Sequence, residues 1–218
     1  MALIHTDFDP LKHGFRFPNN FELDLLSYVQ LPIIKNTKYG DLIYGLCGGM
    51  CFSALDYFYE KKPIPDNSDI GEINYKLFSY IWKRQMDSLQ GKTLIKMAKW
   101  MVYADSTLAR LITKQESVTL RHRINNKDPV VLVLLRVSGF SNPTLNHQVI
   151  ATAYKFDPDQ QDLTVYLYDP NHPGKIPTLS MNLSKPSQGM KIEQSSGERV
   201  RGFYVIPYAW KPPLYSSY

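Results

Sequence analysis

The sequence HQVIATAYKFDPDQQDLTVYLYDPN occupies residues 147–171 and has the pattern of a β-hairpin. Its two arms, residues 148–156 and 163–168, are rich in Val, Leu, Thr and Tyr, and the polar segment DPDQQD lies between them. Such runs on either side of a turn signal predict two antiparallel strands. Antiparallel pairing brings Asp169, at the end of the second arm, back beside His147 at the start of the first.

The segments around this hairpin extend the prediction to the rest of the chain. Residues 130–137, VVLVLLRV, are apolar on both faces and predict a central strand, and residues 202–206 predict one more. The first half is helical in pattern, with helices expected at 22–28, 50–60, 72–88 and 93–113. We therefore expect an α+β fold, in which a helical first half packs on an antiparallel sheet from the second half.

We expect a single domain, residues 1–218, with an N-terminal arm at 1–38 and a C-terminal tail at 207–218. A composition of 44% apolar and 21% charged residues is typical of globular proteins and argues against disordered, collagen and coiled-coil classes. The longest purely apolar run, residues 130–135, is far too short to span a bilayer. The first residues lack the apolar core of a secretory signal, so we expect a cytoplasmic protein, with leaderless export left open.

The net charge of +5 is compatible with nucleic-acid binding. However, Lys92, Lys96 and Lys99 recur at helical spacing, which is typical of the solvated face of a helix, and no nucleic-acid motif accompanies them. We expect no specific nucleic-acid partner. The oligomeric state is not fixed by any sequence feature.

The segment GLCGGMC, residues 45–51, places Cys47 at the start of a helix. Free N–H groups and the helix dipole at that position stabilise a thiolate, and the neighbouring glycines admit a substrate and free amides such as that of Gly48 for an oxyanion. Cys51 lies one turn deeper on the apolar stripe and is expected to be a packing residue. The alternative is that both cysteines are core residues and the glycines only form the turn. Two cysteines without a second pair or a suitably spaced His predict no metal site, and we expect no cofactor.

A thiolate nucleophile needs a base, and His147 is the best placed of the five histidines because it opens a strand after a loop. Asp169 would accept a hydrogen bond from its imidazole and orient the ring. Taken singly, His147 is better explained as a satisfied histidine at a strand end. Asp169 can be a turn residue before Pro170 and still orient the imidazole. The chain order Cys47, His147, Asp169 in these three contexts favours a catalytic triad.

These residues resemble the papain-like cysteine peptidase superfamily. The segment from His147 to Asn171 is similar to the His–Asp hairpin of the bacterial double-glycine leader peptidases, and GLCGGMCF, HQVIA and YDPNHPG also resemble an uncharacterised bacterial group. The resemblance covers residues 39–60 and 130–174. It implies a papain-like fold with Cys47 as nucleophile, His147 as base and Asp169 as the orienting acid.

One position departs from the family pattern. Papain-like peptidases place an oxyanion-binding Gln about six residues before the nucleophile, and this chain has Asp41 there, whereas its nearest upstream Gln is Gln30. An ionised carboxylate cannot donate a hydrogen bond. The oxyanion would then be held by the N–H of Cys47 together with another group, for which the candidates are Asn19, Asn20 and Asn146.

The expected function is that of a papain-like cysteine hydrolase that cleaves a peptide, isopeptide or other amide through an acyl-enzyme. An acyltransferase or transglutaminase-like enzyme would use the same triad. A third possibility is an inactive papain-like module that binds a protein partner through its aromatic C-terminal segment YAWKPPLYSSY. We expect that segment to be strapped over the core instead.

Overall fold

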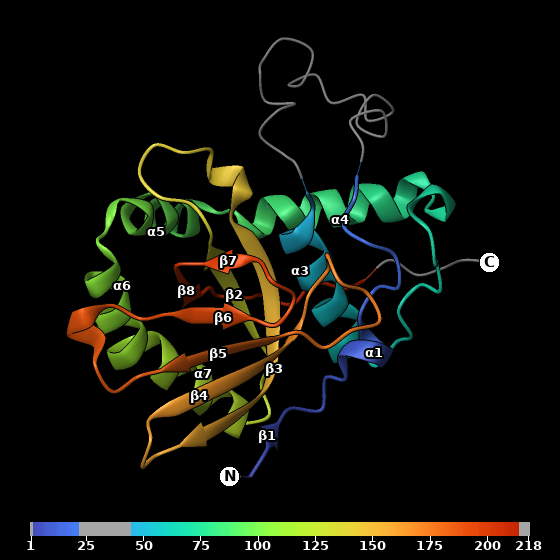
Figure 1. The fold of residues 1–218 in the computed structure, drawn as a ribbon. Helices are drawn as coiled ribbons and strands as arrows, with labels where there is room; N and C mark the ends of the chain where they lie inside the picture. The colour runs from blue at the N-terminus through green and yellow to red at the C-terminus, as the bar shows by residue number, and fades with distance from the viewer. Residues whose placement is uncertain (1, 22–44, 214–218) are drawn as a thin grey trace.

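The computed structural model describes residues 2–21 and 45–213. The predicted helix at 22–28, Gln30 and Asp41 lie outside the described residues. The order of the elements confirms an α+β protein, because helices dominate up to residue 125 and strands dominate after residue 130 (Figure 1). The helical elements are α1 (Pro10–His13), α3 (Cys47–Tyr59), η2 (Ile70–Glu72), α4 (Tyr75–Ser88), α5 (Gly91–Val102), α6 (Asp105–Leu111), η3 (Ile112–Glu116), α7 (Ser117–Asn125), η4 (Pro143–Leu145) and η5 (Pro186–Gln188).

All pairings in the sheet are antiparallel, in the order β7-β6-β5-β4-β3-β2-β8, with β1 beside β3. The four predicted strands are confirmed, as β2 (Val130–Leu135), β3 (His147–Asp157), β4 (Asp162–Tyr168) and β8 (Gly202–Val205). Every residue of β2 is buried, as expected of a central strand. Four shorter strands are not predicted from the sequence: β1 (Ile4–His5), β5 (Thr178–Asn182), β6 (Ile192–Gln194) and β7 (Arg199–Val200).

Helix α3 is the central helix of the fold. Most residues of its sequence, CGGMCFSALDYFY, are small or apolar, so other elements can pack against it on all sides. It is buried from Cys47 to Tyr57 and packs against both α4 and β3. It also begins three residues before the predicted start at residue 50. The N-terminus of this helix therefore lies inside the protein and faces the start of β3.

The single helix predicted at residues 93–113 is wrong. The chain is extended at Tyr103 and Ala104, where ψ is 144° and 150°, so α5 and α6 are separate helices. Arg201 lies at this break and donates to the carbonyl of Tyr103 at 3.1 Å and to the carboxylate of Asp105 at 2.7 Å. A residue almost a hundred positions away thus satisfies the polar groups that the helix break exposes.

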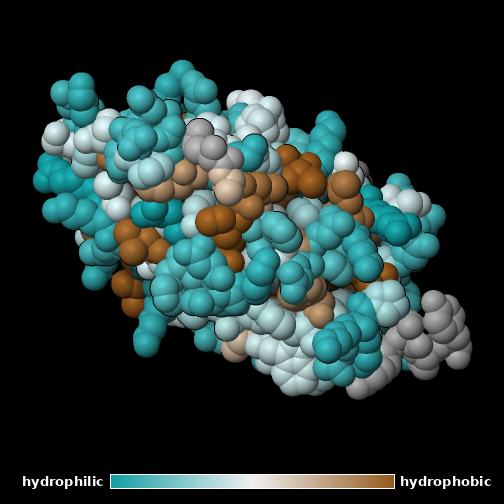
Figure 2. Space-filling model, turned by 90° about the horizontal axis from the view of Figure 1, so that it is seen from below, coloured by the Kyte–Doolittle hydropathy of each residue, from teal (hydrophilic) through white to brown (hydrophobic). Residues whose placement is uncertain are grey.

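One cluster of buried apolar side chains extends from Phe8 to Ile206 and joins the helices to the sheet. The described part of the N-terminal arm belongs to this core, because Phe8, Phe15 and Phe17 are buried and β1 pairs with β3. Figure 2 shows a largely hydrophilic face with hydrophobic groups across its middle. Within the described residues, no helix has the length and apolar character needed to cross a membrane.

The start of the C-terminal segment is strapped over α3 and α4, as expected. Asp56 of α3 accepts hydrogen bonds from the hydroxyl of Tyr208 at 2.6 Å and from the backbone N–H of Lys211 at 2.9 Å. Arg84 of α4 pairs with Asp56 at 2.7 Å and donates to the carbonyl of Ala209 at 2.8 Å. A buried ion pair therefore holds residues 208–211 against the two helices.

Candidate active site

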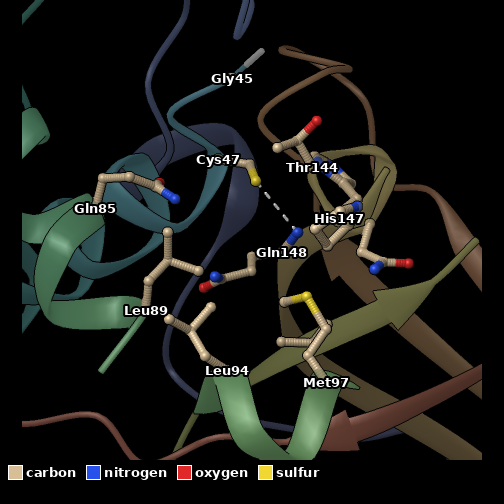
Figure 3. A pocket seen from close by; sticks show the side chains of 12 residues that line it. Gly45, Cys47, Gln85, Leu89, Leu94, Met97, Thr144, His147 and Gln148 are labelled. Carbon is tan, nitrogen blue, oxygen red and sulfur yellow. Dashed lines mark hydrogen bonds between the residues drawn. The ribbon is translucent and has the colours of Figure 1, made fainter. Parts of the chain in front are cut away.

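Cys47 is the first residue of α3, and its thiol is almost buried, with 8% of the residue exposed. The backbone N–H of Gln148 donates to its Sγ at 3.3 Å (Figure 3). The side chain of His147 also interacts with the sulfur. Burial raises the pKa of a thiol, but the charge of His147 and the hydrogen bonds from His147, Gln148 and Gly48 outweigh it. The net effect is a lowered pKa for Cys47, which favours the thiolate.

His147 is the first residue of β3, and its Nε2 donates to Oδ1 of Asp169 at 2.6 Å. This bond occupies Nε2, so Nδ1 is the ring nitrogen that remains for Cys47. Burial lowers the pKa of His147, but the charges of Cys47 and Asp169 outweigh it and raise that pKa to about 9. The directions of the two shifts favour a thiolate–imidazolium pair, which titrates as a unit.

Asp169 follows the last residue of β4 and is fully buried. Burial raises the pKa of a carboxyl group, yet the charge of His147 and the hydrogen bonds from His147 and the Asn171 N–H lower it overall. Asp169 Oδ2 also accepts from Gln194 of β6 at 3.1 Å. The hairpin register, which pairs Ile150 with Tyr168, brings Asp169 to His147 as predicted.

Cys51 is fully buried one turn along α3, and its thiol donates to the carbonyl of Gln148 at 3.5 Å. Burial, the neighbouring Cys47 and Asp169 raise its pKa well above the usual value. Both cysteines are free thiols, but their environments favour thiolate only at Cys47. The predicted division between a reactive and a packing cysteine therefore agrees with the electrostatics of the site.

The expectation that the glycines after Cys47 admit a substrate is wrong, because they pack against protein instead. A Cβ on Gly48 would lie 2.2 Å from Ser88 Oγ and 2.5 Å from Gln148 Oε1. Gly49 meets the backbone of α4 just as closely, and its N–H donates to Gln85 Oε1 at 2.8 Å. The N–H of Gly48 contributes to the hydrogen bonding of the Cys47 sulfur, so it is not a free oxyanion donor.

The three candidate asparagines have different positions. Asn19 Oδ1 accepts from the N–H of Leu46 at 2.7 Å, and its Nδ2 donates to Asn171 Oδ1 at 3.0 Å, which ties the N-terminal arm to the start of α3. Asn146 is turned to other partners, accepting from the N–H of Arg136 at 3.0 Å and donating to the sulfur of Met101 at 3.4 Å. Asn20 lines the same cavity as Asn19.

Two cavities meet at Cys47 and His147. One, of about 90 Å³, is mainly apolar, and Figure 3 shows Leu89, Leu94 and Met97 lining it below the thiol. The other, of about 280 Å³, is polar, with Asn19, Asn20, Arg136 and Asn171 among its lining residues. Gly45, Thr144 and Asn146 line both. A molecule bound across the thiolate would therefore have an apolar side and a polar side.

Four residues at or around the site are not predicted from the sequence: Gln148, Gln85, Ser88 and Arg136. Gln148 directly follows the predicted base, and that position is the only sequence signal for any of them. Among the residues that the structure describes, no group of three or more His, Cys, Asp or Glu is arranged to hold a metal ion. Comparison of the chain with protein-family models, with curated proteins and with solved structures gave no match.

Proposed function

We propose that this protein is a cysteine hydrolase with a papain-like arrangement, acting on a peptide or other amide bond. The observation that carries the proposal is the chain of contacts from the Cys47 sulfur to His147 and, at 2.6 Å, from His147 to the buried Asp169. A nucleophile, a base and a group that orients the base are what covalent catalysis requires. The helix-borne thiol packed on an antiparallel sheet supports the papain-like part of the proposal.

The proposed reaction begins with attack of the Cys47 thiolate on the substrate carbonyl carbon. The imidazolium of His147 then gives its proton to the leaving nitrogen as the carbon–nitrogen bond breaks, which leaves a thioester on Cys47 and a neutral imidazole. His147 next takes a proton from water, whose oxygen attacks the thioester and displaces the thiolate. Asp169 keeps the ring oriented and stabilises its charged form throughout.

The developing oxyanion would be held at the N-terminus of α3. The Gly49 N–H is used by Gln85 and the Met50 N–H closes the first turn on Leu46, which leaves the N–H of Cys47 without an acceptor among the described residues. Asn19 supplies a second donor in this proposal, because only one of its two amide hydrogens is needed for Asn171. It takes the place of the Gln that the family pattern has near Asp41.

The proposal includes a cytoplasmic location, which suits a protein whose reactivity depends on a reduced thiol. Acyl transfer to an amine is the nearest alternative, since it shares every step up to the thioester. Product analysis in the presence of a primary amine distinguishes the two reactions.

Thiol labelling tests the proposal directly. Iodoacetamide or E-64 should modify Cys47 selectively at neutral pH, with the site assigned by mass spectrometry, and leave Cys51 unmodified in the folded protein. His147→Ala should slow the labelling of Cys47 strongly. Equal and slow modification of both thiols would contradict the proposal and favour an inactive binding module.

A further inference from the structure

Gln194 is a polar side chain at a position of β6 that faces the core. Ile192 and Gln194 of this strand are buried and Glu193 between them is exposed, and Gln194 pairs with the fully buried Leu179 of β5. This alternation predicts an apolar residue at position 194. Burying an amide is unfavourable unless a hydrogen bond compensates for the lost water, so the partner of Gln194 explains why it lies here.

The partner of Gln194 is the carboxylate of Asp169. The Nε2 of Gln194 donates to Asp169 Oδ2 at 3.1 Å, while its Oε1 is buried without a hydrogen-bond partner among the described residues. Chemistry fixes the orientation of the amide, because an ionised carboxylate only accepts hydrogen bonds and Oε1 cannot donate one. The bond to Asp169 is therefore the contact that favours Gln194 over an apolar residue.

The two oxygens of Asp169 have different partners. Oδ1 accepts from Nε2 of His147 at 2.6 Å and from the N–H of Asn171 at 2.9 Å. Oδ2 has Gln194 as its only hydrogen-bond partner within the described part of the chain. Asp169 is fully buried, so bulk water cannot replace this donor. An ionised carboxylate in the interior depends on such hydrogen bonds, because its desolvation is costly.

The backbone holds Gln194 in place beside Asp169. Gln194 is the last residue of β6, and its carbonyl accepts from the N–H of Gly197 at 2.9 Å. The N–H of Ser195 donates to the carbonyl of Thr178 at 2.9 Å, and the N–H of Thr178 donates to Ser195 Oγ at 2.9 Å. The end of β6 is thus fixed against β5, and a side chain on such a rigid element can orient a neighbour.

We propose that Gln194 is a positioning residue of the active site, which holds Oδ2 of Asp169 so that Oδ1 stays directed at His147 and the carboxylate stays ionised. The proposal rests on the proposed hydrolase function, since it adds one residue behind the Cys47–His147–Asp169 arrangement. A carboxylate held at both oxygens cannot turn about its Cβ–Cγ bond without losing a hydrogen bond. Gln194 lines neither of the two cavities at the thiolate, so it acts through Asp169 and not on a substrate.

The test follows the protonation of Asp169 through the ring of His147. NMR spectra of the full-length Cys47→Ala protein with isotope-labelled histidine are recorded from pH 3 to pH 9, so that no step of catalysis is involved. The low-pH change in the His147 signal reports Asp169, and the other four histidines are internal references. Losing a hydrogen bond to a charged group changes an equilibrium by about tenfold or more. In Gln194→Met, the pKa of Asp169 should therefore rise by about one unit or more.

Two substitutions and a control separate the hydrogen bond from packing. Gln194→Met keeps the length of the side chain and removes the donor, whereas Gln194→Asn keeps the amide but is one methylene shorter. Both should move the titration of Asp169 in the same direction, and thermal melts show which variants fold. The matched control is Ile192→Val, which weakens packing on the same face of β6 and should leave the titration of Asp169 unchanged.

An Asp169 titration that stays native in a folded Gln194 variant, or that moves equally in Ile192→Val, would overturn the proposal. Hydrolysis is measured separately on the protein with Cys47 intact. If the titration depends on Gln194 and no amide is hydrolysed, the positioning role is supported and the proposed function is contradicted. If amides are hydrolysed and the titration ignores Gln194, only the positioning role fails.

Discussion

Replacing Asp169 with Asn should shift the pH range in which Cys47 is reactive. The substitution keeps the size of the side chain but removes the charge that holds the imidazolium, which Asp169 contacts at 2.6 Å in a fully buried position. The pKa of His147 is raised from 6.5 to about 9, and one pKa unit corresponds to about 1.4 kcal/mol. The net stabilisation of the imidazolium is therefore about 3 kcal/mol, because the attraction of Cys47 and Asp169 outweighs the opposing effect of burial.

The direction of this shift in pH range follows from the ion pair between the Cys47 thiolate and the His147 imidazolium. In the native protein, the thiolate forms below the usual pKa of a thiol because the imidazolium persists up to about pH 9. Without Asp169, the pKa of His147 falls and the pKa of Cys47 rises toward its ordinary value. Each unit by which the pKa of Cys47 rises lowers the thiolate fraction about tenfold at any pH below that pKa, so the reactivity profile moves to higher pH. Activity at neutral pH should fall further, since the ring also loses its orientation.

The assay is the second-order rate constant for alkylation of Cys47 by iodoacetamide between pH 4 and pH 10. Asp159→Asn is the matched control, because Asp159 is exposed in the turn between β3 and β4, and its profile should equal that of the native protein. An Asp169→Asn protein that folds normally and gives the native pH profile would refute the ion-pair reasoning.

Three further substitutions, one of them with a matched control, test the packing of the core and of the site. Arg84→Met should destabilise the protein by about 3–5 kcal/mol in urea unfolding, because it leaves Asp56 buried without its ion-pair partner; an unchanged midpoint would contradict this. Gly48→Ala should cost about 1–3 kcal/mol by overpacking, whereas Gly91→Ala, where a Cβ meets nothing within 4 Å, should be neutral or slightly stabilising. Cys51→Ala should lower stability slightly and leave the alkylation rate of Cys47 within about twofold, and a large loss of that rate would show that Cys51 takes part in the site.

The features that the sequence predicts well are local ones. The hairpin at residues 147–171 is specified by its own alternation and turn, and its register alone brings Asp169 to His147. The helix start at Cys47 is likewise marked by the glycines around it, although their role is different from the predicted one. Neighbouring residues determine these features, so a single sequence is sufficient to find them.

The features that the sequence does not predict depend on contacts between distant segments. Arg201 provides hydrogen bonds to the polar groups at the break between α5 and α6. The only local sign of this break is the acidic Asp105 in the first turn of α6. Asn19 reaches the start of α3 from the N-terminal arm, and the strands β5 to β7 are short, with partly polar sequences. No periodicity in the sequence identifies these contacts, because tertiary packing determines which distant segments lie against each other.

The position of the Cys47 sulfur depends both on a local sequence motif and on contacts between distant segments. Glycine at position 48 lets α3 approach Gln148 and α4 closely enough that a Cβ would clash with both Gln148 Oε1 and Ser88 Oγ. That close approach puts the Gln148 N–H at 3.3 Å from the sulfur and places His147, one residue earlier, beside it. A larger residue would push the helix from the strand and lengthen the contacts that lower the pKa of the thiol. We infer that the glycine motif contributes to reactivity by setting the distance between helix and strand.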